Sequence, residues 1–265
     1  MCENASEKFE DLKNPYFDLQ SKVGISKHVG GLKGTLDLVK LCRIKKESHI
    51  LEIGCGVGKT TCYLAENIGC KIIAVDLSPE MIQRAKERAQ KKNLLDKIRF
   101  KESNAMQLPF PDNTFDAVIS ESVTAFPEDK QKAINEYYRV LKSGGFVGLN
   151  ETTWIKTPTE DIRKFAYDSA GGVKPESRER WIELMENSGL KMTSIKVMKM
   201  KMLEQMKGEI ELAGGESLIA GWKMIKLYFT SPVYRKVIHN MIGTAKKMPG
   251  KLLDYYGYGI YIGMK

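Results

Sequence analysis

The stretch LEIGCGVGKT, residues 51–60, has glycine at three alternate positions, Gly54, Gly56 and Gly58. The apolar run SHILEIG, which begins at residue 48, predicts a strand, and KTTCYLAENIG predicts a helix that ends at Gly69. Glycine between a strand and a helix allows a tight turn and lets backbone N–H groups approach a ligand beside the helix N-terminus. The stretch therefore predicts a ligand-binding turn.

Short apolar runs and helical patterns alternate from residue 48 to residue 150. In the connection after the run KIIAVDLS, Ser78, Pro79 and Glu80 provide an N-cap, a first-turn proline and a first-turn acid for the next helix. Repeated strand–helix units predict a parallel sheet. Further strands are expected at KIRFKES, FDAVISES and FVGLNET, and a helix at DKQKAINEYYRVLKSGG that ends at Gly144-Gly145.

The rest of the chain predicts further helices and strands that belong to the same domain. SRERWIELMENSG predicts a helix, KMTSIKVMKMKM a strand with Met198, Met200 and Met202 on one face, and DYYGYGIYIGMK a final strand. We expect a single domain over residues 1–265. Its predicted parts are a helical lid (1–45), a core (46–202 and 253–265) and a helical insertion that caps the acceptor (203–252).

Composition limits the class of protein. The hydrophobic content of 42% is enough for a sizeable core, and no run reaches the roughly 20 apolar residues of a membrane-spanning helix. The N-terminus has no secretory pattern, and five cysteines within the first 70 residues fit free thiols in a reducing cytosol, so we expect a cytoplasmic protein. Scattered histidines and the lack of a CxxC pair predict no metal site.

Positive charge is concentrated in one part of the chain. Residues 191–265 contain 13 Lys/Arg and 5 Asp/Glu, or +8 of the formal net charge of +9. A basic segment indicates nucleic acid, an anionic membrane surface or an acidic ligand as a partner, or simply a solvated face.

Two common phosphate-binding motifs do not fit the glycine stretch. A P-loop, GxxxxGK[ST], ends correctly at Gly58-Lys59-Thr60 but needs a glycine at Ile53. A dinucleotide motif, GxGxxG, that began at Gly54 would need glycine or alanine at Lys59. What remains is an acid, Glu52, followed by three alternate glycines.

This pattern resembles [DE]xGxGxG, the first motif of the class I S-adenosylmethionine-dependent methyltransferases. DLSPEMIQRA, SNAMQLPFPDNTFDAVIS and EYYRVLKSGGFV resemble later motifs of that family, in order, over residues 48–150. The narrower resemblance is to quinone-biosynthesis and sterol C-methyltransferases. It implies an α/β, Rossmann-like sheet that is mostly parallel with an antiparallel last strand, and helices on both faces.

The resemblance also implies S-adenosyl-L-methionine as cofactor. Glu52 would hold its amino group, and Asp76, 18 residues after Gly58, would accept hydrogen bonds from the ribose hydroxyls. Asn104 stands where the family usually has aspartate, but an amide oxygen can also accept from the adenine amine. The expected cofactor-binding residues are Glu52, Gly54, Cys55, Gly56, Gly58, Asp76, Leu77, Met81, Asn104 and Ala105.

Candidate catalytic residues lie on the acceptor side. Glu121 ends the fourth strand, at the edge where parallel sheets bind ligands, and is a candidate general base or orienting group. His28 lies in the expected lid, which Gly30 and Gly31 can hinge. Either residue has an ordinary structural alternative, a cap or a loop position. Tyr16 and Phe17 are weaker candidates on the same segment.

These features predict methyl transfer to a small, partly apolar acceptor. Nine of the 13 methionines lie in residues 191–265, where they form either core or an adaptable apolar pocket that touches a membrane surface through the basic face. One alternative is an RNA methyltransferase that uses the basic C-terminal part, although no RNA-binding module is recognisable. Another is a non-catalytic module that binds S-adenosylmethionine. The sequence leaves the acceptor and the oligomeric state open.

Overall fold

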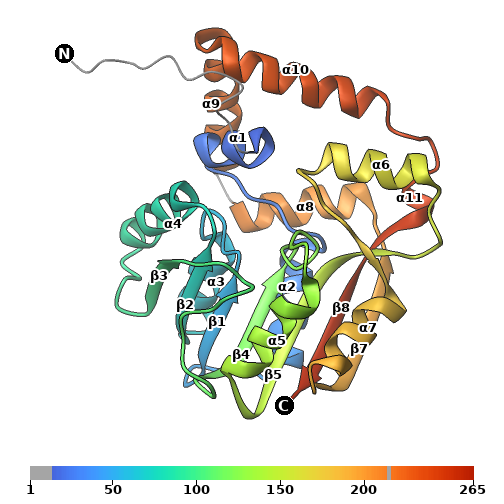
Figure 1. Ribbon diagram of the computed structural model, residues 1–265. Coiled ribbons are helices and arrows are strands. Elements are labelled where there is room, and N and C mark those ends of the chain that lie inside the picture. The colour runs from blue at the N-terminus through green and yellow to red at the C-terminus, as the bar shows by residue number, and fades with distance from the viewer. Residues whose placement is uncertain (1–13, 214–215) are drawn as a thin grey trace.

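The computed structural model describes residues 14–213 and 216–265 (Figure 1). Residues 1–13 of the expected lid, with Cys2, and residues 214–215 of the expected insertion lie outside this part. The structure contains an eight-stranded sheet with the order β3-β2-β1-β4-β5-β8-β7, and β6 pairs beside β5. The strands are β1 (His49–Ile53), β2 (Lys71–Asp76), β3 (Ile98–Glu102), β4 (Phe115–Glu121), β5 (Leu141–Trp154), β6 (Glu176–Ser177), β7 (Lys191–Lys199) and β8 (Tyr256–Met264).

The sheet is parallel except for its last strand. Strands β1 to β5 pair in parallel, whereas β8 lies between β5 and β7 and is antiparallel to both. The fold class expected from the sequence is therefore confirmed. Ile53 pairs with Val75 in β2 and with Ser120 in β4, so the turn after β1 lies between the ends of these two strands.

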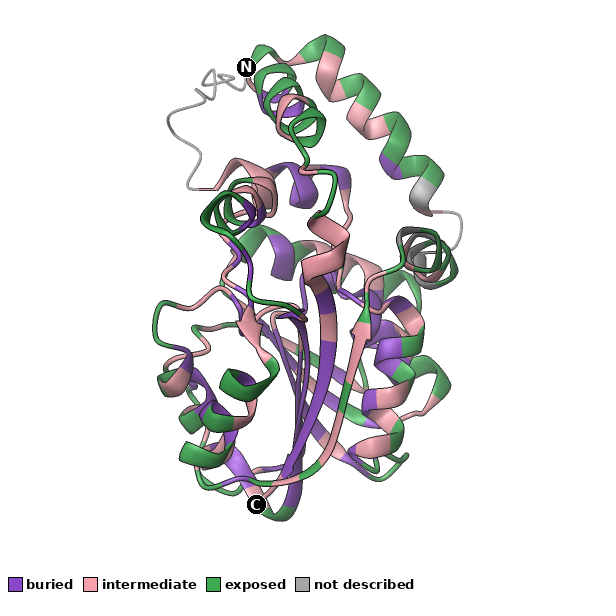
Figure 2. Ribbon diagram, turned by 90° about the vertical axis from the view of Figure 1, so that its right-hand side faces the viewer, coloured by how far each residue is buried: buried purple, intermediate pink, exposed green. Residues whose placement is uncertain are grey.

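Helices cover both faces of the sheet (Figure 1). On one face, buried residues of α2, α3 and α4 pack with Ile50 and Ile72, and on the other, residues of α5 and α7 pack with Leu51 and Val118. Neighbouring strand residues thus enter opposite cores, as strand geometry requires. Figure 2 shows the strands largely buried between these layers. The helices are α1 (Pro15–Val23), α2 (Gly31–Leu41), α3 (Lys59–Asn67), α4 (Pro79–Lys91), α5 (Lys130–Val140), α6 (Glu160–Ser169), α7 (Arg178–Asn187), α8 (Met202–Ala213), α9 (Glu216–Thr230), α10 (Pro232–Lys246) and α11 (Leu252–Tyr255).

Local signals placed two helix ends correctly. The Ser78 side chain caps α4 by accepting from the Met81 N–H, with Pro79 in the first turn. Gly69, just after α3, has a φ of +80°, the left-handed conformation expected of a residue that ends a helix.

Two expected elements end earlier than the sequence suggested. Helix α5 ends at Val140 rather than at Gly144-Gly145, because the fully buried Leu141 is already extended and pairs with Phe115. Strand β7 ends at Lys199, so Met200 and Met202 do not continue it. Its partner β8 begins at Tyr256, which leaves no neighbouring strand for the residues that follow.

The N-terminal and C-terminal helices come together at the carboxyl edge of the sheet. Helix α1 packs against α9 and α10 in a cluster that includes Leu19, Val23, Ala220 and Tyr234, and α8 lies against α2 (Figure 1). The expected lid over residues 1–45 and the expected acceptor cap over residues 203–252 stay predictions. Within the described residues, every helix is too short or too polar to cross a membrane.

Candidate functional site

The turn between β1 and α3 has a backbone that glycine alone adopts without strain. Gly54, Gly56 and Gly58 have φ angles of +69°, +53° and +75°, in the left-handed region that L side chains rarely occupy. A Cβ atom on Gly54 would lie 2.2 Å from Val123 Cγ2, and one on Gly56 would lie 2.8 Å from Ser26 Cβ. Both backbone conformation and close neighbours therefore require the alternate glycines.

The carboxylate at the end of β2 contacts this turn directly. The Gly56 N–H donates to Asp76 Oδ2 at 2.8 Å, and the Ser78 N–H donates to Oδ1 at 2.9 Å. Burial raises the pKa of Asp76 above its ordinary value, although these N–H donors act in the opposite direction. Each carboxylate oxygen has more than one lone pair, so Asp76 can still accept hydrogen bonds from a ligand at the turn.

Glu52 is a buried carboxyl group beside the turn. Glu52 is 5% exposed. Its Oε2 atom has no hydrogen-bond partner within residues 14–213 and 216–265. Burial raises the pKa of Glu52 to about 8; the Thr61 hydroxyl acts in the opposite direction, and the nearby carboxylates of Glu121 and Asp76 raise it further. A buried acceptor without a donor is costly, and a cationic donor such as an ammonium group would satisfy it.

Three more of the expected ligand residues lie in the turn or shortly after β2. Leu77 is exposed directly after β2, and Met81 is buried in the first turn of α4. The Cys55 N–H donates to the Val75 carbonyl at 2.9 Å, and its side chain lies in the core, where burial raises the thiol pKa well above its ordinary value. Cys55 thus supports the turn from the core side, whereas Leu77 presents an apolar surface to solvent.

The segment after β3 also lies beside Asp76. The Ser103 N–H donates to the Asp76 carbonyl at 2.9 Å. Asn104 is exposed, and its Oδ1 accepts from the Met106 N–H at 2.9 Å, while Ala105 is half-buried against the core. Asn104 Oδ1 thus already accepts one hydrogen bond within its own turn. The expected contact between Asn104 and adenine stays a prediction.

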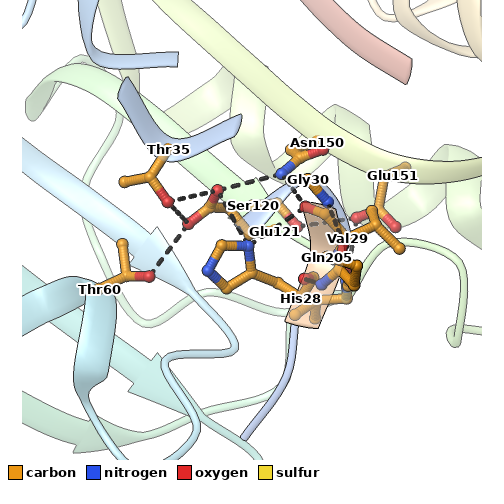
Figure 3. Close-up of polar contacts among 12 residues, drawn as sticks. His28, Val29, Gly30, Thr35, Thr60, Ser120, Glu121, Asn150, Glu151 and Gln205 are labelled. Atoms are coloured by element: carbon orange, nitrogen blue, oxygen red, sulfur yellow. Dashed lines mark hydrogen bonds and ion pairs between the residues drawn. The ribbon is translucent and has the colours of Figure 1, made fainter. Parts of the chain in front are cut away.

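Glu121, at the end of β4, accepts hydrogen bonds from three elements (Figure 3). Thr35 Oγ1 of α2 lies 3.1 Å from both carboxylate oxygens, Thr60 Oγ1 of α3 lies 3.1 Å from Oε2, and Asn150 Nδ2 of β5 lies 3.2 Å from Oε1. His28 Nδ1 is 3.6 Å from Oε1. The structure therefore brings together Glu121 and His28, which the sequence singled out separately.

The segment that contains His28 is held against the ends of β4 and β5. Asn150 Nδ2 donates to the Val29 carbonyl at 2.7 Å. Gln205 of α8 binds the segment in both directions, since its Nε2 donates to the His28 carbonyl at 2.6 Å and its Oε1 accepts from the Gly30 N–H at 2.9 Å. An element late in the chain therefore fixes the position of the candidate catalytic histidine (Figure 3).

A second buried carboxyl group, Glu151, lies beside the connection after β4. Its Oε1 accepts from the Val123 N–H at 3.0 Å, the Thr124 N–H at 2.7 Å and Ser120 Oγ at 3.3 Å. Glu151 Oε2 has no hydrogen-bond partner in the described part of the chain. Burial raises the pKa of Glu151 to about 7. Like Glu52, it is an acceptor suited to a ligand donor.

The segment between α1 and α2 covers the glycine turn. Ser26 lies close to the turn, and its carbonyl accepts from Lys59 Nζ at 3.3 Å. On α1 itself, the ring centroids of Phe17 and Phe126 are 5.2 Å apart, and Tyr16 packs edge-on against Phe17 at 5.3 Å. The weaker candidates Tyr16 and Phe17 thus lie near the end of β4.

Two hollows on the surface lie away from this edge. One, of about 270 Å³, is lined by Arg43, Asp116 and Gly144 at the amino ends of the strands. The other lies beside α4 and β3 and is lined by Lys86 and Phe100. Neither is lined by residues of the glycine turn, against which Ser26 lies.

Sequence reasoning missed several residues of the site. Thr60 stands in the GKT triplet. Asn150 and Glu151 lie in FVGLNET, where the alignment of Asn150 with Glu121 in parallel strands was a usable signal. Thr35 and Gln205 had no such signal, because only the folding of α2 and α8 onto the sheet brings them to the site.

Known proteins are similar to the chain over the same region. A family model described as a methyltransferase domain matches residues 51–149. A demethylmenaquinone methyltransferase of Listeria welshimeri is 31% identical over 164 residues, which are 60% of this chain and 68% of that protein. A sterol 24-C-methyltransferase of Pneumocystis carinii is 37% identical over 112 residues, which are 42% of this chain and 29% of that protein. The aligned stretch thus spans less than a third of the sterol relative.

A solved structure agrees with the fold. Phosphoethanolamine N-methyltransferase 2 of Haemonchus contortus, in complex with phosphomonomethylethanolamine and S-adenosylhomocysteine, superposes with a TM-score of 0.70 and 20% sequence identity. The match covers 99% of this chain and 59% of that chain. At this identity the likeness supports the architecture and not a particular acceptor.

Proposed function

Because the chain belongs to the class I S-adenosylmethionine-dependent methyltransferases, we propose that it transfers a methyl group from S-adenosylmethionine to a small, partly apolar acceptor. The observation that carries the proposal is the hydrogen bond from the Gly56 N–H to Asp76 Oδ2, at 2.8 Å. The bond supports a single nucleoside site, because the glycine turn and the carboxylate lie at one point of the sheet edge.

Each part of the cofactor has a candidate partner. Glu52 Oε2, a buried acceptor, would accept a hydrogen bond from the ammonium group of the cofactor. Asp76 would accept from the ribose hydroxyls, and the glycine turn would leave room for the methionine backbone. When bound, the cofactor supplies a methyl group on a positively charged sulfur, which an acceptor displaces in line. The adenine end is assigned to Leu77, Met81, Asn104 and Ala105.

Glu121 and His28 are proposed to act together on the acceptor. The Thr35, Thr60 and Asn150 donors fix the Glu121 carboxylate. His28 Nδ1 lies 3.3 Å from the Val29 carbonyl and 3.6 Å from that carboxylate, so a proton on Nδ1 can be donated to the carbonyl and lies close to the negative charge. This tautomer leaves Nε2 as the basic atom, and His28 can then take a proton from the acceptor while Glu121 holds its ring.

The partly apolar character of the acceptor rests on side chains near the end of β4. Phe17 of α1 packs against Phe126 in the connection after β4. In the same connection the Val123 and Thr124 N–H groups bind Glu151. Aromatic rings together with one buried acceptor suit an apolar molecule that has a single donor group.

The cofactor site can be tested by isothermal titration calorimetry with S-adenosylmethionine. Asp76→Ala should weaken binding by about tenfold or more, which is about 1.4 kcal/mol. Asp96→Ala, which removes an exposed aspartate after α4, is the matched control and should bind normally. Unchanged affinity in a folded Asp76→Ala variant would contradict the site as described.

The reaction can be tested with methyl-labelled S-adenosylmethionine and a fractionated cell extract. Label in a small, organic-soluble product, with release of S-adenosylhomocysteine, is the expected result. Label in RNA would favour the nucleic-acid alternative. Cofactor binding without any release of S-adenosylhomocysteine would favour the non-catalytic module.

A further inference from the structure

Helix α9 is apolar on two sides. Its inner side packs against α1 and α10, where Ala220, Met224 and Leu227 join the cluster around Leu19 and Tyr234. Its outer side is left uncovered by the described residues. Four large apolar residues, spaced four, three and four positions apart, share this side and are more than half exposed. We define the outer stripe of α9 as Leu218, Trp222, Ile225 and Phe229.

The segment that carries the outer stripe is strongly basic. Residues 216–251 contain seven Lys/Arg and a single acid, Glu216. Arg88 of α4 forms a salt bridge with Glu216, so this acid is already neutralised. Lys226 of α9 and Lys246 and Lys247 at the end of α10 are exposed. In Figure 1, α9 and α10 lie at the end of the molecule farthest from the C-terminus.

We propose that the outer stripe of α9, with the basic residues of α9 and α10, binds the surface of membranes that contain anionic lipids. Exposed aromatic and aliphatic side chains can enter the headgroup region, while lysines contact the lipid phosphates. A second copy of the chain would bring two positive surfaces together. Nucleic acid would use the positive charge but gives no reason for a continuous apolar stripe. The charge and the apolar stripe together fit an anionic lipid surface best.

The inference goes beyond methyl transfer and can be tested without cofactor or acceptor. The chain has three tryptophans, of which Trp154 is 6% exposed, Trp181 is fully buried and Trp222 is 73% exposed. A change in fluorescence on adding vesicles therefore reports on Trp222. We expect a blue shift, and quenching by brominated lipid, with phosphatidylcholine–phosphatidylglycerol vesicles but not with phosphatidylcholine alone. Trp222→Phe should abolish the signal and retain most of the binding.

Sedimentation with the same vesicles measures how much the apolar residues and the lysines each contribute to binding. The double variant Leu218→Ser/Phe229→Ser should bind at least about tenfold more weakly, because it removes two apolar contacts. Lys223→Gln/Lys226→Gln should weaken binding by roughly fivefold per charge, and added salt should weaken the wild type similarly. Leu95→Ser, the same change at an exposed leucine between α4 and β3, is the matched control and should bind normally.

Three outcomes would overturn the proposal. The first is wild-type protein that stays in the supernatant with anionic vesicles. The second is a dimer in sedimentation velocity that Leu218→Ser/Phe229→Ser dissociates, which would assign the stripe to a second copy. The third is tight binding of an RNA oligonucleotide that the same double variant abolishes. Unchanged urea-denaturation midpoints in each variant show that the fold is intact, and because this readout needs no cofactor, the test is separate from that of the proposed function.

Discussion

Glu52→Gln should stabilise the protein at pH 8 and leave it nearly unchanged at pH 5. The carboxyl group of Glu52 is almost fully buried, and its Oε2 has no donor among the described residues. Burial raises the pKa of Glu52 from 4.5 to about 8, so the folded protein holds this group neutral where the unfolded chain ionises it. Glutamine has nearly the same shape and cannot ionise.

The sign follows from the direction of the shift. Because the folded pKa is raised, the stability due to neutral Glu52 is fully present below the unfolded value of 4.5 and is lost as pH rises through about 8. The loss is about 1.4 kcal/mol for each pH unit between these values. Between pH 6 and pH 8 the wild type should therefore lose about 2–3 kcal/mol relative to the glutamine variant.

Urea denaturation at pH 5, 6 and 8 measures this difference as a free energy of unfolding. Glu151, whose pKa burial raises to about 7, titrates in both proteins and cancels from the comparison. Glu179→Gln, at an exposed position of α7, is the matched control. If the glutamine variant differed from wild type by the same amount at all three pH values, Glu52 would not be the buried, protonated group described here.

The same residue links stability to the cofactor. If a ligand ammonium group binds Glu52, it favours the ionised carboxylate, and binding near pH 7 should release a proton. Calorimetry of S-adenosylmethionine binding in two buffers of different ionisation enthalpy would detect this proton in the wild type and not in Glu52→Gln. Buffer-independent enthalpy in both proteins would contradict the assignment of Glu52 to the ammonium group.

Three further changes test the turn and the acceptor side. Gly54→Ala should lower the unfolding free energy by about 2–5 kcal/mol, since it adds left-handed strain to a Cβ contact of 2.2 Å with Val123 Cγ2. Gly144 has a φ of +77°, but an added Cβ there would meet open space, so Gly144→Ala should lower the unfolding free energy by only about 1–2 kcal/mol. Equal losses for the two variants in urea denaturation would contradict the packing explanation. Glu121→Gln should lower turnover by about tenfold or more in a radiometric assay while cofactor affinity in calorimetry stays nearly constant, and a wild-type rate would remove Glu121 from the mechanism. Glu151→Gln should gain stability over wild type between pH 5 and pH 8, because burial raises the Glu151 pKa to about 7, and a pH-independent difference would refute this.

The sequence predicted the meeting of the glycine turn and Asp76 because that meeting follows from local rules. A strand, a tight turn and a helix place Gly56 at the carboxyl end of β1, and the next parallel strand ends at Asp76 beside it. The capping of α4 by Ser78 was equally local. Such features depend on residues close in sequence and on the common direction of parallel strands.

Other features depend on contacts between distant parts of the chain. The end of α5 at Val140 follows from the pairing of Leu141 with Phe115, and the end of β7 follows from where β8 begins. The position of His28 depends on Gln205, 177 positions away. No local pattern contains this information, because the hydrogen bonds of Gln205 exist only after α8 has packed against α2.

Two buried carboxyl groups, Glu52 on β1 and Glu151 on β5, each have one oxygen without a hydrogen-bond partner in the described part of the chain. Glu52 lies just before the turn, and Glu151 Oε1 accepts from the Val123 N–H in the connection after β4. Each lowers the stability of the folded chain, because burial without a donor disfavours a polar atom. Under the proposed function, Glu52 would bind the ammonium group of the methyl donor, and Glu151 Oε2 would be the acceptor atom available to the second ligand. Loss of methyl transfer with unchanged cofactor affinity in Glu151→Gln would support this division of roles, and a wild-type rate would contradict it.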